Sequence, residues 1–237
     1  MDIRTNSNAE LLGQEARTVL AKFLKNNARR SILLLCSGGS ALDLLQDTPK
    51  DCLGPNMTLG VLDERYSSDE AINNFAQLEK TSFFQAARRA GAHVIDTRPK
   101  EGETHEQLTL RFESELRSWM KDHPGGIIVA TMGIGSDGHT AGIMPFPEDE
   151  TLFWALFGEL GRFVQDYDAG DKNQHPQRIT ITLSFLVMIN HAIVYCVGEG
   201  KRIALERVMA EEGSCAHTPA RIIREMKDVL LFTDITL

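Results

Sequence analysis

The chain has 237 residues, of which 42% are hydrophobic, and since α/β folds of this length commonly form one domain, we expect residues 1–237 to make up a single domain. Lys and Arg total 25 against 33 Asp and Glu, and the net charge of -8 argues against a nucleic-acid-binding surface and against binding to anionic membranes. No apolar stretch is long enough to span a bilayer and the N-terminus lacks the order of a signal peptide, so we expect a cytoplasmic protein.

The first half of the chain predicts alternating helices and strands. Asn8 is expected to cap a helix, because the apolar residues from Leu11 to Leu24 recur at helical spacing. The elements that follow are expected over residues 31–36 (strand), 37–44 (turn and short helix), 57–62 (strand), 73 or 74 to 89 (helix), 92–96 (extended) and 104–121 (helix).

The second half continues the alternation. Its elements are expected over residues 126–132 (strand), 152–163 (helix), 178–183 and 192–197 (strands), 199–209 and 219–226 (helices) and 229–233 (strand). Residues 166–177, polar with Gly170 and Pro176, are expected to be linker-like. The pattern predicts a Rossmann-like, mostly parallel sheet with helices on both faces, whose ligand lies beyond the carboxyl ends of the strands.

The four cysteines show no C-x-x-C spacing. Cys36 and Cys196 lie inside apolar, strand-like runs, where cysteine behaves as a small hydrophobic residue. A reducing compartment is the natural expectation.

Polar or glycine-rich segments follow three of the predicted strands, at residues 37–40, 63–65 and 133–139, and we expect them to meet at one edge of the sheet. The Gly-Gly-Ser turn at 38–40 offers backbone donors and a hydroxyl to a phosphate; alternatively, Ser40 simply caps the next helix. Asp63, Glu64 and Arg65 belong either to this site or to a solvated loop.

The third segment, residues 133–139, carries the titratable pair Asp137 and His139 between glycines. These glycines let backbone N–H groups approach a ligand closely and leave both side chains free to project. The alternative is a glycine-rich connection with one exposed histidine.

Taken together, these segments resemble the family of glucosamine-6-phosphate isomerases/deaminases and 6-phosphogluconolactonases, over most of the chain. The resemblance rests mainly on Gly135-Ser-Asp-Gly-His-Thr-Ala141. Its marks in order are Gly38-Gly-Ser40, Leu62-Asp-Glu-Arg65, Asn73-Asn-Phe75, Gly133 to Pro145, Arg178-Ile-Thr180 and Gly198-Glu-Gly-Lys201.

The residues after His139 resemble the lactonase branch, with Thr140 and Ala141. The isomerase/deaminase branch typically has a catalytic Glu just before the Pro, where this chain has Met144, which cannot transfer a proton. Glu148, four residues on, is a poor substitute. Two stretches depart from the lactonase pattern: Gly142-Ile-Met-Pro-Phe146 replaces the usual Ser-Leu-Phe-Pro-Gly, and residues 147–176 look unlike the family.

The resemblance implies hydrolysis of 6-phosphoglucono-δ-lactone in the oxidative pentose phosphate pathway. His139 would be the general base, and Asp137 would orient its ring or the water, or cap a following helix; Arg65 or backbone N–H groups of 133–138 would stabilise the oxyanion. The residues implied to bind the sugar phosphate are Gly38, Gly39, Ser40, Asp63, Asn74, Gly135, Arg178 and Lys201. Without the resemblance, the sequence would indicate only that Arg178 begins a strand and that Lys201 is a solvated residue of a helix.

No cofactor and no metal is expected, since the remaining histidines show no ligand spacing. Two other functions share this site: glucosamine-6-phosphate isomerisation and deamination, and non-catalytic binding of a sugar phosphate. The sequence gives no indication of the oligomeric state.

Overall fold

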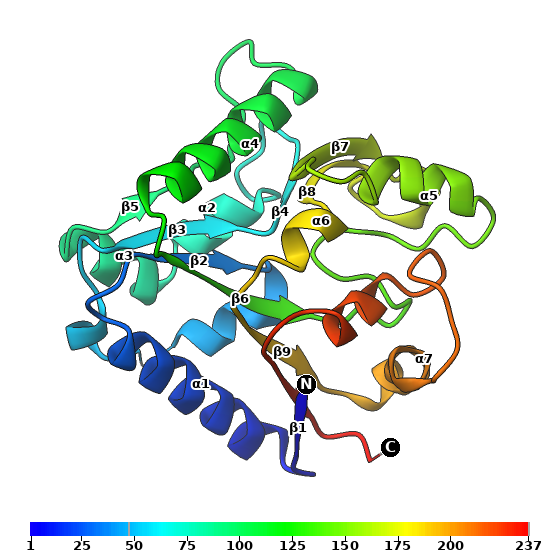
Figure 1. Ribbon diagram of the computed structural model, residues 1–237, viewed down its shortest axis with the longest axis horizontal. Coiled ribbons are helices and arrows are strands. Elements are labelled where there is room, and N and C mark those ends of the chain that lie inside the picture. The colour runs from blue at the N-terminus through cyan, green and yellow to red at the C-terminus, as the bar shows by residue number, and fades with distance from the viewer. Residues whose placement is uncertain (47, 237) are drawn as a thin grey trace.

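The computed structural model describes residues 1–46 and 48–236, without the side chain of residue 40. Its main element is a seven-stranded sheet in the order β1-β10-β9-β6-β2-β3-β5, with every neighbouring pair parallel (Figure 1). The strands are β1 (Asp2–Thr5), β2 (Ile32–Cys36), β3 (Met57–Val61), β5 (His93–Val94), β6 (Ile127–Gly133), β9 (His191–Cys196) and β10 (Val229–Thr233). The predicted sheet is confirmed, with β1 as an additional edge strand.

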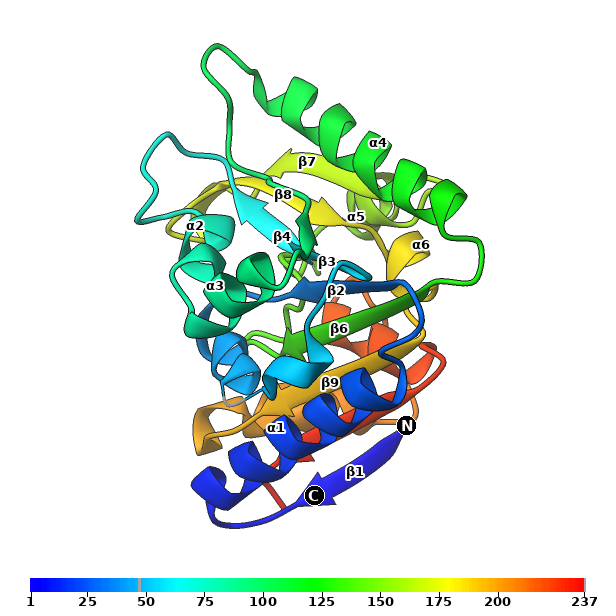
Figure 2. The ribbon, with the colours of Figure 1, turned by 90° about the vertical axis from the view of Figure 1, so that its left-hand side faces the viewer.

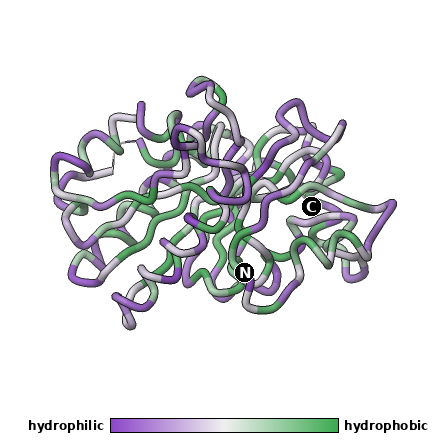
Figure 3. Tube along the Cα trace, turned by 90° about the horizontal axis from the view of Figure 1, so that it is seen from above, coloured by the Kyte–Doolittle hydropathy of each residue, from purple (hydrophilic) through white to green (hydrophobic). Residues whose placement is uncertain are grey.

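Helices cover both faces of this sheet, as predicted. Along β2 the side chains alternate: Ile32 and Leu34 join the apolar cluster of the first group of helices, whereas Leu33 and Leu35 join that of the second. The first group is α1 (Ala9–Asn26), α2 (Asn74–Glu79) and α3 (Ser82–Arg89); the second is α4 (His105–Asp122), α5 (Glu150–Phe157), α6 (Leu183–Leu186) and α7 (Arg202–Met209). Figure 3 shows hydrophobic residues in the interior of the molecule and hydrophilic residues mostly on its peripheral loops.

A second, antiparallel sheet has the strand order β4-β8-β7 and lies beside α4 (Figure 2). It consists of β4 (Asp63–Arg65), β7 (Val164–Asp168) and β8 (Gln177–Ile181). Of the two alternatives for Asp63 to Arg65, the solvated loop is excluded, because these residues form β4. The prediction that residues 166–177 are linker-like is wrong at both ends, since residues 166–168 belong to β7 and Gln177 begins β8. β4 is too short, and β7 too polar, to show a clear hydrophobic periodicity in the sequence.

Several predicted helices have different bounds. The helix predicted to run to residue 89 is two helices, because Thr81 caps α3 by accepting a hydrogen bond from the Phe84 N–H at 3.1 Å. The helix predicted to reach residue 163 ends at Phe157, where Gly158 follows. Asn8 caps α1 as predicted, accepting from the N–H groups of Glu10 and Leu11.

The remaining helical turns are of the 3-10 type. They are Gly39–Leu45, Lys50–Cys52, Gly170–Lys172, Glu199–Lys201 and Pro219–Arg224. The first and last correspond to the helices predicted over residues 37–44 and 219–226, and Glu199–Lys201 is the start of the helix predicted over residues 199–209. Gly38 rather than Ser40 occupies the capping position of the first. In the described part of the chain, no helix has the length and apolar character needed to cross a membrane.

Candidate active site

A pocket of about 250 Å³ opens at the carboxyl ends of the parallel strands, where the strand order reverses between β2 and β6. Its walls come from the segments that follow β2, β3, β6 and β9, together with β8 and the start of α2. The lining residues are Ser37, Gly38, Gly39, Asp63, Arg65, Asn74, Gly133, Ile134, Gly135, His139, Ala141, Gly142, Arg178 and Lys201. The three segments expected to meet at one edge of the sheet therefore do so.

His139 forms one wall of this pocket and is oriented by Asp137. The Asp137 Oδ1 lies 2.6 Å from His139 Nδ1 and also accepts the His139 backbone N–H at 3.0 Å. Nδ1 therefore carries the proton in the neutral ring, which leaves Nε2 as the basic nitrogen. Partial burial opposes ionisation of Asp137, but the hydrogen bond and charge of His139 hold the pKa of its carboxyl below the usual value.

The turn that carries this pair requires glycine at two positions. A Cβ on Gly135 would lie 2.1 Å from His139 Nδ1, so any other residue would displace the ring. Gly138 has φ +92 and its carbonyl accepts the Ala220 N–H at 2.9 Å. Asp137 does not cap a helix, because the next helix along the chain begins only at Glu150. Its contacts therefore agree with the other expected role, which is to orient His139.

Asp63 and Arg178 form a buried ion pair that also lines the pocket, with side chains 5% and 6% exposed. Asn74 donates from Nδ2 to the Asp63 carbonyl at 2.9 Å and to its carboxylate at 3.1 Å. The Arg178 carbonyl lies 2.9 Å from His105 Nε2. Asn74 therefore holds Asp63, and His105 contacts the backbone of Arg178. Neither charged side chain is solvated.

Arg65 lies next to this pair and is half-buried. Burial lowers the pKa of its guanidinium, the charge of Arg178 lowers it further, and Asp63 and Glu64 oppose both effects. Its Nη1 donates to the Ile72 carbonyl at 3.2 Å. The described pocket lining thus holds three cations, Arg65, Arg178 and Lys201, and the Asp63 carboxylate, in a chain of net charge -8.

Glu64 lies behind the pocket and is fully buried. Its carboxylate accepts from the N–H groups of Arg65, Asn74 and Phe75 at 2.8, 2.6 and 3.0 Å, and from the Thr97 hydroxyl at 2.9 Å. Burial raises the pKa of this carboxyl to about 7, against the effect of these hydrogen bonds. Glu64 therefore joins the strand that carries Arg65 to the helix that starts at Asn74.

Several buried polar atoms of the pocket have no hydrogen-bond partner in the described structure. They are Ser37 Oγ, Arg65 Nε, Asn74 Oδ1 and Arg178 Nε. Unpaired buried donors and acceptors are costly, so their concentration at one pocket indicates a polar ligand. Gly38 is part of this arrangement, since a Cβ there would lie 2.5 Å from Asn74 Oδ1.

Of the residues singled out from the sequence, most line the pocket. Asp137 instead lies behind His139 and lines a neighbouring groove of about 740 Å³, as does Glu148, which pairs with Lys172. The backbone of Ser40 lies in the first 3-10 turn, and its side chain is outside the described part. Five other lining residues are not among the individually predicted site residues: Ser37, Gly133, Ile134, Ala141 and Gly142. Ser37 was detectable as the first polar residue after β2.

Comparisons with known proteins agree on one family. The model of the glucosamine-6-phosphate isomerases/6-phosphogluconolactonase family matches residues 6–232. A human 6-phosphogluconolactonase is 26% identical over 212 residues, covering 86% of this chain and 76% of the human protein, and one from Nostoc is 27% identical over 177 residues, covering 73% and 68%. The crystal structure of 6-phosphogluconolactonase from Leishmania guyanensis has the same fold, with a TM-score of 0.75 and 19% identity over 98% of this chain and 95% of that one.

Proposed function

Because the chain belongs to the glucosamine-6-phosphate isomerase/6-phosphogluconolactonase family, we propose that it hydrolyses 6-phosphoglucono-δ-lactone to 6-phosphogluconate, in the oxidative pentose phosphate pathway. The observation that carries this proposal is the position of His139: its ring, oriented by Asp137, faces a pocket that also holds Arg65, Arg178 and Lys201. A base for water and a cluster of cations for phosphate are what hydrolysis of a phosphorylated lactone requires.

In this reaction His139 Nε2 takes a proton from water as the water oxygen attacks the lactone carbonyl carbon. The imidazolium that forms is stabilised by the Asp137 carboxylate through Nδ1. Negative charge develops on the carbonyl oxygen, where Arg65 or the backbone N–H groups of residues 133–138 stabilise it. When the tetrahedral intermediate collapses, the bond to the ring oxygen breaks and His139 returns its proton to that oxygen, giving the open-chain acid.

The phosphate is held on the other side of the pocket. Arg178 and Lys201 supply the positive charge, and the Gly39 turn, at φ +66, supplies backbone N–H groups. Arg178 already neutralises Asp63, and its unpaired Nε remains available for a ligand. The unpaired Asn74 Oδ1 and Ser37 Oγ are available to sugar hydroxyls.

Two observations favour lactone hydrolysis over isomerisation and deamination of glucosamine 6-phosphate. Met144, where the isomerase/deaminase branch has its Glu, is buried in the core and lies outside the described pocket lining. Glu148 is held by Lys172, which lowers the pKa of its carboxyl, and it faces the neighbouring groove. Neither position thus supplies the described pocket with the carboxylate that the isomerase/deaminase branch has before its Pro.

We place this reaction in the cytoplasm and in a single domain spanning residues 1–237. All four cysteines are free and buried, which suits a reducing compartment.

The proposal is tested by following acid release from freshly prepared 6-phosphoglucono-δ-lactone, with spontaneous hydrolysis subtracted. We expect rapid turnover of this lactone, much slower turnover of unphosphorylated glucono-δ-lactone, and no ammonia from glucosamine 6-phosphate. Ammonia release would favour the isomerase/deaminase reaction. Thermal stabilisation by 6-phosphogluconate without any lactone turnover would favour a binding protein.

A further inference from the structure

In the loop that follows His139, two consecutive residues have a positive φ, and the backbone is strained at the one that is not glycine. Ala141 has φ +48 and Gly142 has φ +76, and both line the pocket. A non-glycine residue in the left-handed region persists only where its surroundings hold it there. The contacts of this loop therefore bear directly on the shape of the pocket.

Two side chains of the small sheet hold the carbonyl groups of these residues. The Thr180 hydroxyl donates to the Ala141 carbonyl, and the Tyr167 hydroxyl donates to the Gly142 carbonyl at 2.5 Å. Tyr167 Oη also accepts the Met144 N–H at 3.4 Å. Burial raises the pKa of the Tyr167 hydroxyl, so that it stays protonated and remains a donor.

Gly142 in turn lies directly against Asp63. A Cβ on Gly142 would lie 2.5 Å from Asp63 Cβ and 2.8 Å from its Oδ2, the oxygen that pairs with Arg178 and accepts from Asn74. The backbone of Gly142 thus forms the surface on which this carboxylate rests. A shift of the loop would move Asp63 and, with it, Arg178.

The register of the small sheet puts these residues on one face. Tyr167 is paired with Arg178 across β7 and β8, Arg178 with Arg65 across β8 and β4, and Thr180 with Asp63. Residues that are directly opposite, or two apart, point to the same side of a sheet. That face carries the ion pair and both hydroxyls that hold the loop.

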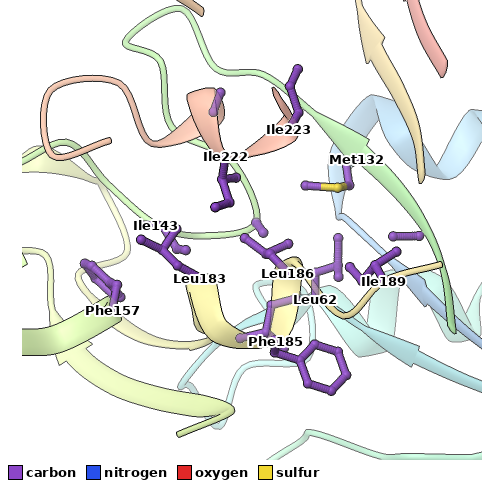
Figure 4. Close-up of a cluster of buried hydrophobic side chains, with 14 of the residues drawn as sticks. Leu62, Met132, Ile143, Phe157, Leu183, Phe185, Leu186, Ile189, Ile222 and Ile223 are labelled. Carbon is purple, nitrogen blue, oxygen red and sulfur yellow. The ribbon is translucent and has the colours of Figure 1, made fainter. Parts of the chain in front are cut away.

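The two stretches that depart from the lactonase pattern meet at Tyr167. Phe146 packs on Tyr167 and on Phe157, with ring centroids 6.2 and 6.1 Å apart, and Phe157 packs edge-on against Tyr167 at 5.0 Å. Ile143, in the same loop as Phe146, is buried in the core beside Leu183 (Figure 4). The unusual 147–176 segment thus packs against the unusual 142–146 loop.

We propose that Tyr167 is a positioning residue of the pocket: its hydroxyl fixes the Gly142 carbonyl, and Gly142 keeps Asp63 and Arg178 in the arrangement that binds the substrate phosphate. This inference rests on the proposed function. It assigns a role in substrate binding to the segment that looks least like the family. Tyr167 itself does not line the described pocket wall, so it acts only through the loop.

The test compares Tyr167→Phe with Tyr195→Phe. Tyr195 also donates its hydroxyl to a backbone carbonyl, that of Ala9 at 3.0 Å, so the control removes the same atom and the same kind of bond outside the pocket lining. We expect Tyr167→Phe to raise KM for the lactone, and Kd for 6-phosphogluconate, roughly five- to tenfold with kcat within about twofold, and Tyr195→Phe to leave KM unchanged.

A double-mutant cycle tests whether Tyr167 acts through Arg178. In an Arg178→Ala background, Tyr167→Phe should raise KM less than about twofold further, because the group that it positions is gone. Gly142→Ala, which pushes a methyl group against Asp63 while keeping Tyr167, should raise KM as well, and it tests the same route if Tyr167→Phe fails to fold.

The inference is overturned by an unchanged KM and Kd in Tyr167→Phe, by an equal rise in Tyr195→Phe, or by full additivity with Arg178→Ala. Absence of lactone turnover by the wild-type protein would instead overturn the proposed function, because the Kd for 6-phosphogluconate tests Tyr167 independently of turnover.

Discussion

The pocket has two walls of different construction. The wall at the end of β6 is a glycine-rich turn on which Asp137 and His139 are partly exposed, at 45% and 36% of their side chains. The wall formed by the small sheet holds Asp63 and Arg178 almost fully buried, and Glu64 behind them. The first wall leaves a proton acceptor open to water, whereas the second fixes charges in place. We infer that the first supplies the base for the chemical step, whereas Asp63 and Arg178 of the second serve binding.

The strongest test of this division is His139→Ala. Removing the base should lower kcat by roughly 10²–10⁴-fold and leave KM nearly unchanged, because general-base catalysis acts on the transition state. Steady-state kinetics on the lactone measure both constants. His93→Ala, an exposed histidine on β5, is the matched control. Near wild-type kcat in His139→Ala would contradict the assignment of the base.

The second wall is expected to respond to pH through Glu64. The pKa of this carboxyl is raised from 4.5 to about 7, so the folded state binds its proton more tightly than the unfolded state. This group therefore favours folding below pH 4.5, and that contribution is lost as pH rises to about 7, for a total on the order of 3 kcal/mol.

Chemical denaturation at several pH values, on the wild type and Glu64→Gln, isolates this contribution. The free energy of unfolding of the wild type should fall between pH 4.5 and about 7 relative to that of the variant, and the difference should be constant above that range. A difference that does not vary with pH would contradict the raised pKa.

These two walls also differ in how far the sequence predicts them. The turn at 133–139 follows a long apolar strand, and its glycines and titratable pair are local signals, so both its place and its residues are predictable. The small sheet is not predictable in the same way. β4 has only three residues, and β7 has the polar sequence Val-Gln-Asp-Tyr-Asp. The pairing of β4 with β8 joins segments that are far apart in the chain.

The same reason explains which residues the sequence reading missed. The burial of Glu64 and the contact of Gly142 with Asp63 arise only when those segments meet. Arg178 could be named from the family resemblance, but its burial and its pairing with Asp63 have no local signal.

Arg178→Ala tests the binding wall directly. Loss of a charge-assisted contact to phosphate should raise KM roughly 10- to 100-fold while kcat changes little. The same substitution at Arg89, exposed at the end of α3, should change neither constant. A fall in kcat at constant KM would place Arg178 with the chemistry and remove the division between the walls.

The smallest effect is expected for Asp137→Asn. Asparagine keeps the shape of the side chain but loses the charge that stabilises the protonated ring of His139. Because both side chains are partly open to water, which screens the lost interaction, we expect kcat to fall only about tenfold, with KM unchanged. The kinetic constants of Asp137→Asn and His139→Ala should therefore change in the same direction and differ in size. A rise in KM for Asp137→Asn would mean that this carboxylate shapes the binding wall through the turn, and that the two walls are not independent.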